Sequence, residues 1–479
     1  MRNILEGATN CMQYFINNRA FYLNLLIFFI FAVFCFCVGI NHEPWADEAQ
    51  SWLIARDCSF YDILFQRCSY EGHPFLWYYI LKFFILIGWK YEYIFIISWL
   101  FSCVGVYLFL FKSNFPEIIK ILVPFSYYIF YQYTVVSRSY CLLFPVFCLL
   151  AIYYNKRFEK TYTYCFLLAL LASIYAYSFV TAFCLLCFFV FDCVQNKTKY
   201  LSFKIKITKS IPIILLTIYM SFVAFTCKSN PDSFASLSNV FTNKSIIKTL
   251  VDLFIDCYFN SAGQYYNFIC FLLTLSLYIF SIKTFCRNIK QILYFAILIM
   301  AVYIAMVLLH YSSWHTGIFF LILIFSCWVF QVENKIDVSI KYNKIFYVLF
   351  VLILLFQIYF SLKQSLIDVK ENNFDKENIV GINYGAVSVQ PYFNKNIFSN
   401  METSYWQFSY KNFDKYLQKT KEQLSKAKIA IVFNLAPAYE RINRQIIRSF
   451  TKSYAIKSNL YVKGIKSKHS GTYYIFIKD

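Results

Sequence analysis

The chain has few charged residues for its length. Of its 479 residues, 15% are charged and 59% are hydrophobic. A single soluble core cannot bury that much apolar surface, which excludes one soluble domain and predicts a membrane protein with several spans. The sequence also has no internal repeat and no linker rich in Pro or Ser.

Several catalytic signatures are absent as well. There is no Gly-rich phosphate-binding loop, no HExxH zinc motif and no nucleophile elbow, so the P-loop, zinc-protease and hydrolase classes lack their usual support. No expected span carries a ladder of acids or arginines, which argues against a proton pump and a voltage sensor.

The net charge of +20 is distributed in short clusters between hydrophobic runs and in the C-terminal tail. This pattern indicates topology determinants rather than one nucleic-acid-binding face, so we expect no nucleic-acid partner. Most of the 17 cysteines lie inside apolar runs, and Cys184 and Cys187 therefore predict packing rather than zinc or redox chemistry. Cys58 and Cys68 could form a disulfide or could both face lipid.

Basic loops determine the expected topology. Phe21 to Ile40, preceded by Arg2 and Arg19, predicts an uncleaved anchor with its N-terminus inside. If Phe75 to Ile87 crossed the membrane, two basic loops would lie outside, against the positive-inside tendency. We therefore expect that segment to be an aromatic helix in the membrane interface.

The sequence then predicts an all-α polytopic membrane protein with about eleven transmembrane helices. The spans are Phe21–Ile40, Tyr93–Phe111, Ile118–Tyr133, Tyr140–Tyr154, two short helices within Thr161–Phe191, Ile211–Cys227, Tyr265–Phe285, Ile292–Leu309, Thr316–Gln331 and Ile345–Leu362. The transmembrane domain covers residues 1–362, with a first external loop at 41–92, which contains the interfacial helices, and a second at 228–264.

The tail, residues 363–479, has short apolar stretches. Ile429–Phe433 and Tyr473–Ile477 predict strands, and Asp414–Lys426 and Arg441–Thr451 predict helices. We expect a small α/β domain outside the membrane.

The first external loop carries two acidic motifs. Asp47 and Glu48 follow Pro44 in a helix-start pattern, so they either stabilise the helix dipole or hold a catalytic carboxylate. Neighbours on a helix diverge by about 100°. We therefore expect that Asp47 and Glu48 do not both act on one atom. Glu71 and His73, on either side of a glycine, could converge on one ion or phosphate or could simply lie in an exposed turn.

Two cationic candidates lie beyond that loop. Arg138 follows an expected span at the outer side, where its guanidinium either reaches lipid headgroups or binds a phosphate. His310 and His315 bracket a short turn on the same expected side, where an interfacial histidine is usually structural.

Three segments in order resemble the C-type integral-membrane glycosyltransferases. They are WADEAQSWLIARDCSF at 45–60, YEGHPFLWYYILKF at 70–83 and YQYTVVSRSYCL at 131–142. The nearest similarity is to bacterial members akin to protein O-mannosyltransferases and lipid A aminoarabinose transferases. The resemblance is strong through about Tyr140, weaker through the later spans and nearly absent in the tail.

This resemblance implies transfer of a sugar from a polyprenyl-phosphate carrier to an acceptor, with inversion at the anomeric carbon. Asp47 matches the family's acid that is proposed as the base toward the acceptor hydroxyl. Glu71 matches a second acid of the family, and His73 and Glu48 are further candidates for that second acid or for a metal ligand. Glu71 and His73 are also the candidate ligands of a divalent metal ion. Arg138 and His315 match the region around the carrier phosphate, although Trp314 stands where many relatives have Arg.

The implied partners are membrane lipids, a lipid-linked donor, and a lipid, polysaccharide or protein acceptor of the cell envelope. The implied location is a bacterial cytoplasmic membrane, with the C-terminal domain outside. Two other classes stay open: a flippase or transporter of lipid-linked sugars, which would not need Asp47, and a sensor that reads ligands through the tail.

Overall fold

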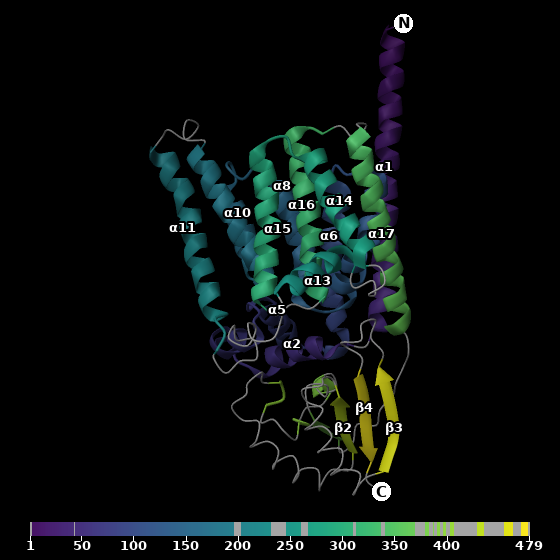
Figure 1. Ribbon diagram of the computed structural model, residues 1–479, viewed down its shortest axis with the longest axis vertical. Coiled ribbons are helices and arrows are strands. Elements are labelled where there is room, and N and C mark those ends of the chain that lie inside the picture. The colour runs from purple at the N-terminus through teal and green to yellow at the C-terminus, as the bar shows by residue number, and fades with distance from the viewer. Residues whose placement is uncertain are drawn as a thin grey trace. The chain divides into compact units, whose positions relative to one another are not determined.

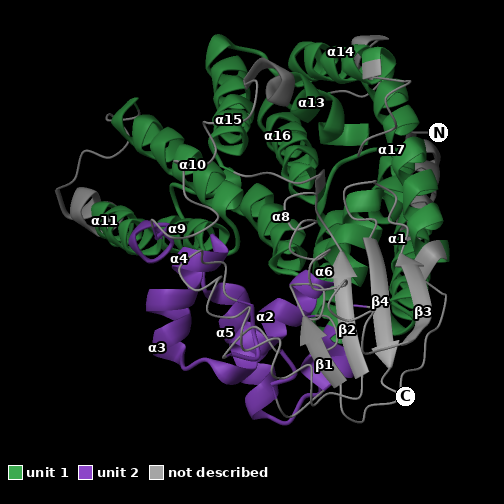
Figure 2. Ribbon diagram, turned by 60° about the horizontal axis from the view of Figure 1, so that its bottom comes forward, with its two compact units in different colours: residues 1–42, 95–223, 244–368 green, residues 43–94, 224–243, 369–479 purple. Residues whose placement is uncertain are grey.

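The computed structural model describes most of the chain up to residue 368 and short parts of the tail. The described residues are 2–42, 44–195, 203–230, 246–259, 267–309, 313–336, 341–368, 379–382, 387, 390–392, 396–398, 403–406, 429–434, 455–462 and 471–477. The chain forms two compact units (Figure 2). Unit 1 contains residues 1–42, 95–223 and 244–368, and unit 2 contains residues 43–94, 224–243 and 369–479.

Unit 1 is helical, and its long helices run side by side (Figure 1). Its elements are α1 (Arg2–Ile40), α6 (Ile94–Lys112), α7 (Glu117–Leu122), η3 (Val123–Phe125), η4 (Tyr127–Val135), η5 (Ser139–Leu142), α8 (Leu143–Tyr154), α9 (Thr161–Ala172), α10 (Ala176–Gln195), α11 (Phe203–Thr226), α13 (Ile246–Phe259), α14 (Asn267–Phe285), α15 (Ile289–Leu308), η8 (Ser313–Thr316), α16 (Gly317–Asn334) and α17 (Lys341–Asp368). α6 begins one residue before the unit boundary, and α11 ends three residues beyond it.

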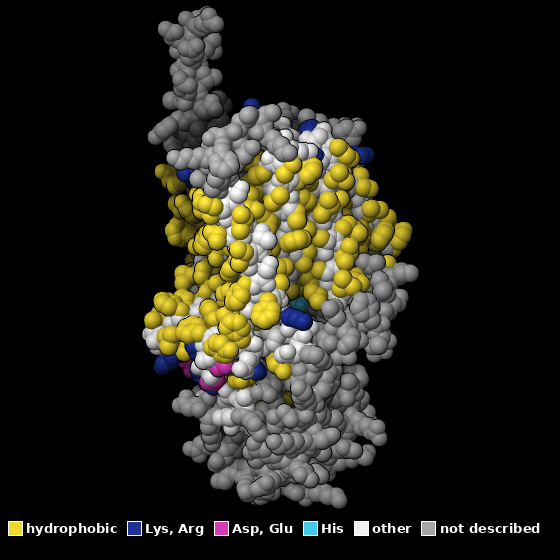
Figure 3. All heavy atoms as spheres, turned by 90° about the vertical axis from the view of Figure 1, so that its left-hand side faces the viewer, with side chains coloured by type: hydrophobic (Ala, Val, Ile, Leu, Met, Phe, Trp, Pro, Cys, Tyr) yellow, Lys and Arg dark blue, Asp and Glu magenta, His cyan; other side chains and the backbone are white. Residues whose placement is uncertain are grey.

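Seven helices among the described residues are long and apolar enough to span a membrane. They carry a belt of exposed hydrophobic side chains, which covers the helices in the space-filling view (Figure 3). The protein is therefore a multi-pass membrane protein. The segments Glu117–Val135 and Ser139–Tyr154, expected to be two separate spans, form a helix pair bent by 119° that makes an eighth candidate.

The helices of unit 1 differ in how much of their surface is buried. α16 is apolar around its whole circumference, and every side chain from Gly317 to Gln331 is buried. α11 instead exposes Ile218 (62%) and Phe225 (68%). A helix that is apolar on all sides either fills a core or meets lipid, so α16 forms the core of unit 1 and α11 lies at its surface.

Polar contacts show which loops of unit 1 share an end. One end is joined by Asn24–Leu110, Gln331–Asn114, Arg157–Asp192, Lys290–Gln195 and Asn334–Phe285. The other end is joined by Ser98–Ser137, Tyr128–Thr316, Tyr140–His315 and Tyr175–His315. The basic loops after α6, α8 and α14 therefore lie at one end, and Arg138 and His315 lie at the other.

The bend of 119° lies at residues 136–138, where Val136 and Arg138 have extended backbones between η4 and η5. Earlier in the first segment, Pro124 lies in the 3-10 turn η3, and the Ser126 hydroxyl donates to the Val123 carbonyl. η4 then continues as nine π-helical residues, all buried, and Val136 N–H donates to the Tyr131 carbonyl. Long π-helical segments are rare and often mark functional sites.

The helices of unit 2 are short. They are α2 (Ala46–Asp57), α3 (Phe60–Asp62), the π-helical η1 (Ile63–Arg67), α4 (Cys68–Glu71), α5 (Leu76–Leu86) and η2 (Tyr91–Tyr93). The 11 residues of α5 extend for about 16 Å, roughly half of a bilayer core. This length agrees with the expectation that Phe75 to Ile87 does not form a full span. Lys82 packs α5 against α2 by donating to the carbonyls of Ala55 and Cys58.

The tail contributes a four-stranded sheet to unit 2, with strand order β1-β2-β4-β3. β1 (Ile379–Ile382) is parallel to β2 (Ile429–Asn434), whereas β4 (Gly471–Ile477) is antiparallel to both β2 and β3 (Ala455–Val462). β2 and β4 cover the two segments that the sequence predicts as strands. The predicted helices at 414–426 and 441–451 lie outside the described residues.

Two expectations need correction. The loop expected at 228–264 contains the 14-residue helix α13, whose residues Leu253, Cys257 and Tyr258 are fully buried within unit 1. In the segment Thr161–Phe191, expected as two short helices, α9 has 12 residues but α10 has 20 and extends to Gln195. α10 continues past Phe191 because Asp192, which ends the apolar run in the sequence, is buried and accepts a hydrogen bond from Arg157.

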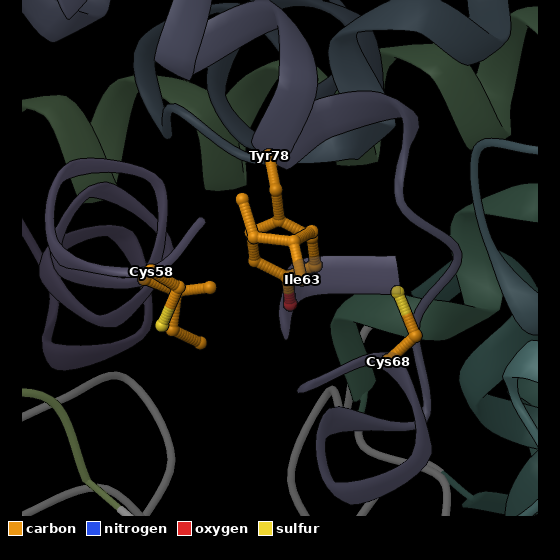
Figure 4. Packing of buried hydrophobic residues seen from close by; sticks show 5 residues of the cluster. Cys58, Ile63, Cys68 and Tyr78 are labelled. Atoms are coloured by element: carbon orange, nitrogen blue, oxygen red, sulfur yellow. The ribbon is translucent and has the colours of Figure 1, made fainter. Parts of the chain in front are cut away.

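Cys58 and Cys68 are free thiols, so neither expectation for this pair holds: they form no disulfide and neither side chain faces lipid. Both lie in one buried cluster with Ile54, Ile63 and Tyr78, in which the two sulfur atoms point into different parts of the core (Figure 4). Cysteine is a small apolar side chain, and packing against Ile63 and Tyr78 is its ordinary use.

We expect both thiols to react slowly in the folded protein. Burial raises the pKa of Cys58 and raises that of Cys68 well above its usual range, so both are protonated at neutral pH. Iodoacetamide should modify them at least about tenfold more slowly than in the SDS-unfolded chain. Peptide mass spectrometry would measure both rates, and equal rates in the two states would contradict the burial of this cluster.

Candidate functional site

The first acidic motif lies at the N-terminus of α2, where its two carboxylates have different surroundings. Glu48 is fully buried, and its Oε2 accepts a hydrogen bond of 2.7 Å from the Trp45 backbone N–H. This bond satisfies a backbone donor at the start of the helix, which is the stabilising role expected of an acid there. Asp47 lies one position earlier, about 100° away around the helix, and is only half-buried.

Gln50 joins the two acidic motifs. Its Nε2 donates to Glu71 Oε1 at 2.8 Å, which links α2 to the end of α4. Asp47 precedes Gln50 by three residues, so the Cβ atoms of these two residues are about 5–6 Å apart on one face of α2. Gln50 thus connects Glu71 to the helix whose first turn carries Asp47.

A tail segment holds that amide in place. The Gln50 side chain accepts from Trp406 N–H and donates to the Trp406 carbonyl, with both distances 2.8 Å. Gln50 itself is 1% exposed. A buried glutamine with both ends bonded has one orientation, so its bond to Glu71 is directed by the backbone of the tail.

The turn after Glu71 places His73 between two helices. Gly72 has φ of +68°, a left-handed conformation that ends α4, and its N–H donates to the Cys68 carbonyl. His73 and Pro74 then lead into α5. Glycine is the residue that adopts this conformation without strain, and it therefore sets the path from Glu71 to His73.

Glu71 and His73 are too few to form a metal site by themselves. No group of three or more His, Cys, Asp or Glu side chains that could hold a metal ion occurs in the part of the chain that the structure describes. One Glu71 oxygen also accepts from Gln50. Because metal sites need more donors than this pair supplies, we assign no chemical step to a metal.

Within unit 1, Arg138 and His315 meet around a cluster of tyrosines. The Arg138 guanidinium lies 5.9 Å from the centre of the Tyr140 ring, and the His315 ring lies 6.1 Å from the same ring. Tyr175 and Tyr177 enclose His315 from the turn between α9 and α10, with ring centres 5.3 and 5.7 Å away. Arg138 and His315 are 177 positions apart in the chain, but the structure places them against one aromatic cluster.

The backbone beside His315 is fixed by a buried polar contact. The hydroxyls of Tyr128 and Thr316 are 2.8 Å apart, and Thr316 also donates to the Asp256 carbonyl of α13. A side chain at Gly317, the next residue, would collide with the Tyr133 hydroxyl and the Tyr128 ring. The turn that carries His315 is therefore packed closely against η4.

Gly317→Ala should consequently displace this turn. The added methyl group has no space beside the two tyrosines, and overpacking of a core typically costs about 1–3 kcal/mol. Thermal unfolding in detergent would measure the loss. Gly88→Ala is a space control, since nothing lies within 4 Å of its added Cβ and any cost comes from its positive φ. No loss for Gly317→Ala would contradict the close packing.

Several residues of the two sites are not evident from the sequence. Tyr175 and Tyr177 lie outside the three motifs, and Gln50 lies inside the first motif but is not one of the residues that the sequence singles out. The only available signal for Gln50 is its spacing from Asp47, and for the tyrosines it is their place at a predicted outer turn. His310 lies outside the described residues.

No protein-family model, no curated protein and no solved structure matches this chain. The chain's own residues and the resemblance of its segments 45–60, 70–83 and 131–142 are therefore the basis for assigning a function.

Proposed function

We propose that the protein is a glycosyltransferase that moves a sugar from a polyprenyl-phosphate carrier to a cell-envelope acceptor at the extracytoplasmic face of the membrane. The sugar is transferred with inversion. The finer topology belongs to this proposal: eleven spans, with the N-terminus inside, and a C-terminal α/β domain outside the bacterial cytoplasmic membrane.

The arrangement around Gln50 is the observation that carries the proposal. Gln50 bonds Glu71 to α2, and Asp47 lies three positions before Gln50 on that helix, so the two acidic motifs belong to one compact unit. The segment that holds both acids begins after α1 and ends before α6, two helices of span length. Carboxylates held at such a position can meet an aqueous acceptor and a donor whose lipid chain stays in the bilayer.

Asp47 acts on the acceptor in this mechanism. Its carboxylate takes the proton of the acceptor hydroxyl while that oxygen attacks the anomeric carbon, and the bond from this carbon to the carrier phosphate breaks. Its place in the first turn of α2 puts this carboxylate beside the positive end of the helix dipole. Glu71 orients the acceptor as a second hydrogen-bond acceptor, held by Gln50.

Arg138 and His315 serve the departing group. The carrier phosphate gains negative charge as the glycosidic bond breaks, and a guanidinium stabilises such an oxyanion through paired hydrogen bonds. The tyrosines around His315 limit its exposure and so strengthen its interaction with charge. Trp314 supplies aromatic surface at this turn, with its ring centre 5.7 Å from that of His315.

A reconstituted assay tests the reaction class. Purified protein in detergent, supplied with a polyprenyl-phosphate sugar and an envelope extract, should form a glycosylated product that mass spectrometry detects. In proteoliposomes the same protein should not translocate the lipid-linked sugar. Translocation without product would overturn the proposal in favour of the flippase. Envelope glycans of a deletion strain would then identify the sugar and its acceptor.

A further inference from the structure

A second arginine in unit 2, Arg67, has an environment that the proposed mechanism does not use. It is the last residue of the π-helical η1, in which Cys68 N–H donates to the Ile63 carbonyl. Its guanidinium carbon lies 5.3 Å from the centre of the Tyr70 ring and 5.2 Å from that of Tyr405. The planar cation is thus held by one ring from α4 and one from the tail.

Within the described residues, Arg67 has no ion pair. Its Nε is buried and has no hydrogen-bond partner there. The carboxylates near it in sequence have other partners: Asp62 accepts from Ser59, and Glu71, four positions after Arg67, accepts from Gln50. Arg56 makes the contrast, since it forms a two-bond pair with Asp57.

The two rings are fixed before any ligand arrives. Tyr405 precedes Trp406, whose backbone is held by Gln50 through two hydrogen bonds. Tyr405 also packs on the buried cluster of Ile54, Cys58, Ile63, Cys68 and Tyr78. On the α4 side, the hydroxyl of Ser69 accepts from Asn230 and donates to the Gln66 carbonyl. The stack is therefore preorganised.

We propose that Arg67 is a binding site for a phosphate group. Stacking on tyrosine faces stabilises a cation, but the two rings supply no negative charge to pair with it. The N–H groups of a guanidinium point outward in its own plane, where they match two oxygens of one phosphate. An oxyanion at that edge would also satisfy the buried Nε.

The identification of this phosphate as that of the polyprenyl carrier rests on the proposed function. A transferase of lipid-linked sugars handles the phosphate of its polyprenyl carrier, and a soluble phosphate ester offers the same chemistry. The geometry of Arg67 and its two tyrosines does not depend on that function. A failure of one proposal can therefore be told from a failure of the other.

Binding measurements on the full-length protein in nanodiscs test the site. Polyprenyl phosphate and inorganic phosphate are titrated separately, with the wild type, Arg67→Gln, Arg67→Lys and the control Arg56→Gln. We expect Arg67→Gln to weaken binding at least about tenfold and Arg67→Lys to weaken it less, because lysine keeps the charge but loses the paired geometry. Arg56→Gln should bind as the wild type does.

Each outcome decides one point. An effect on polyprenyl phosphate alone assigns the site to the carrier, and an effect on inorganic phosphate as well assigns it to phosphate in general. Equal binding by the wild type and Arg67→Gln for both probes overturns the proposal. If Arg67→Gln does not fold, unchanged binding by Arg67→Lys overturns it. Translocation of the lipid-linked sugar by the wild type without any glycosylated product would overturn the proposed function and leave the Arg67 result standing.

Discussion

Asp47→Asn is expected to lower the rate of sugar transfer by about 10²- to 10⁴-fold, the usual contribution of a general base. Asparagine has nearly the same shape as aspartate but cannot take the proton of the acceptor hydroxyl. The side chain is half-buried at the first turn of α2, so the helix should persist. The measurement is kcat with a polyprenyl-phosphate sugar in detergent, together with thermal unfolding to show that the variant is folded.

Glu48→Gln is the matched control for this experiment. Glu48 is the adjacent carboxylate, and its Oε2 accepts from the Trp45 N–H at the start of α2. Glutamine keeps an oxygen for that bond, so we expect transfer within a factor of a few and a stability loss of about 1 kcal/mol or less. Normal transfer by Asp47→Asn, or an equal loss in both variants, would remove Asp47 from the mechanism.

The sequence predicts the long apolar helices well because lipid-facing and core-facing runs are recognised by composition alone. α16 begins and ends within three residues of its predicted bounds, whereas α17 begins four residues before and ends six residues after its predicted bounds. The bend between η4 and η5 is different, since it falls at residues 136–138, after a π-helical segment whose hydrogen bonds leave no periodic signal. Hydropathy predicts the two apolar segments but not the angle of 119° between them.

The candidate sites also contain residues that the sequence predicts and residues that it does not. The motifs around Asp47 and Glu71 can be found from the sequence because acids are rare beside membrane spans. Gln50 cannot be found in this way, since its function comes from the backbone of Trp406, 356 positions away. Arg67 is also missed, because an arginine next to a tyrosine in sequence says nothing about a second ring from the tail. Such pairings are set by tertiary contacts.

The end of unit 1 opposite His315 carries the largest expected effect on stability. Asp192 on α10 is 1% exposed, and its carboxylate accepts from Arg157 at 2.9 Å, from Tyr294 at 2.7 Å and from Lys290. Arg157 is itself buried, and its other terminal nitrogen donates to the Tyr154 carbonyl. One carboxylate thus balances two cations at the point where α8, α10 and α15 meet.

Asp192→Asn should therefore destabilise the protein by about 3–5 kcal/mol, because it leaves Arg157 buried without its nearest counter-charge. Glu333 lies 3.8 Å from Arg157 and offsets only part of this loss. Unfolding by SDS or by heat in detergent measures the change. The partly exposed pair of Arg56 and Asp57 provides the comparison, since its removal through Arg56→Gln should cost about 1 kcal/mol or less.

A double variant separates burial of charge from loss of contact. Replacing both partners with apolar residues, Arg157→Met with Asp192→Leu, removes the uncompensated cation, and such replacements of buried pairs are often neutral or stabilising. We therefore expect the double variant to be more stable than Asp192→Asn alone, although Lys290 and Tyr294 also lose their acceptor. If the double variant is instead the less stable of the two, direct attraction within the pair, rather than the cost of an unpaired buried charge, stabilises this end of the bundle.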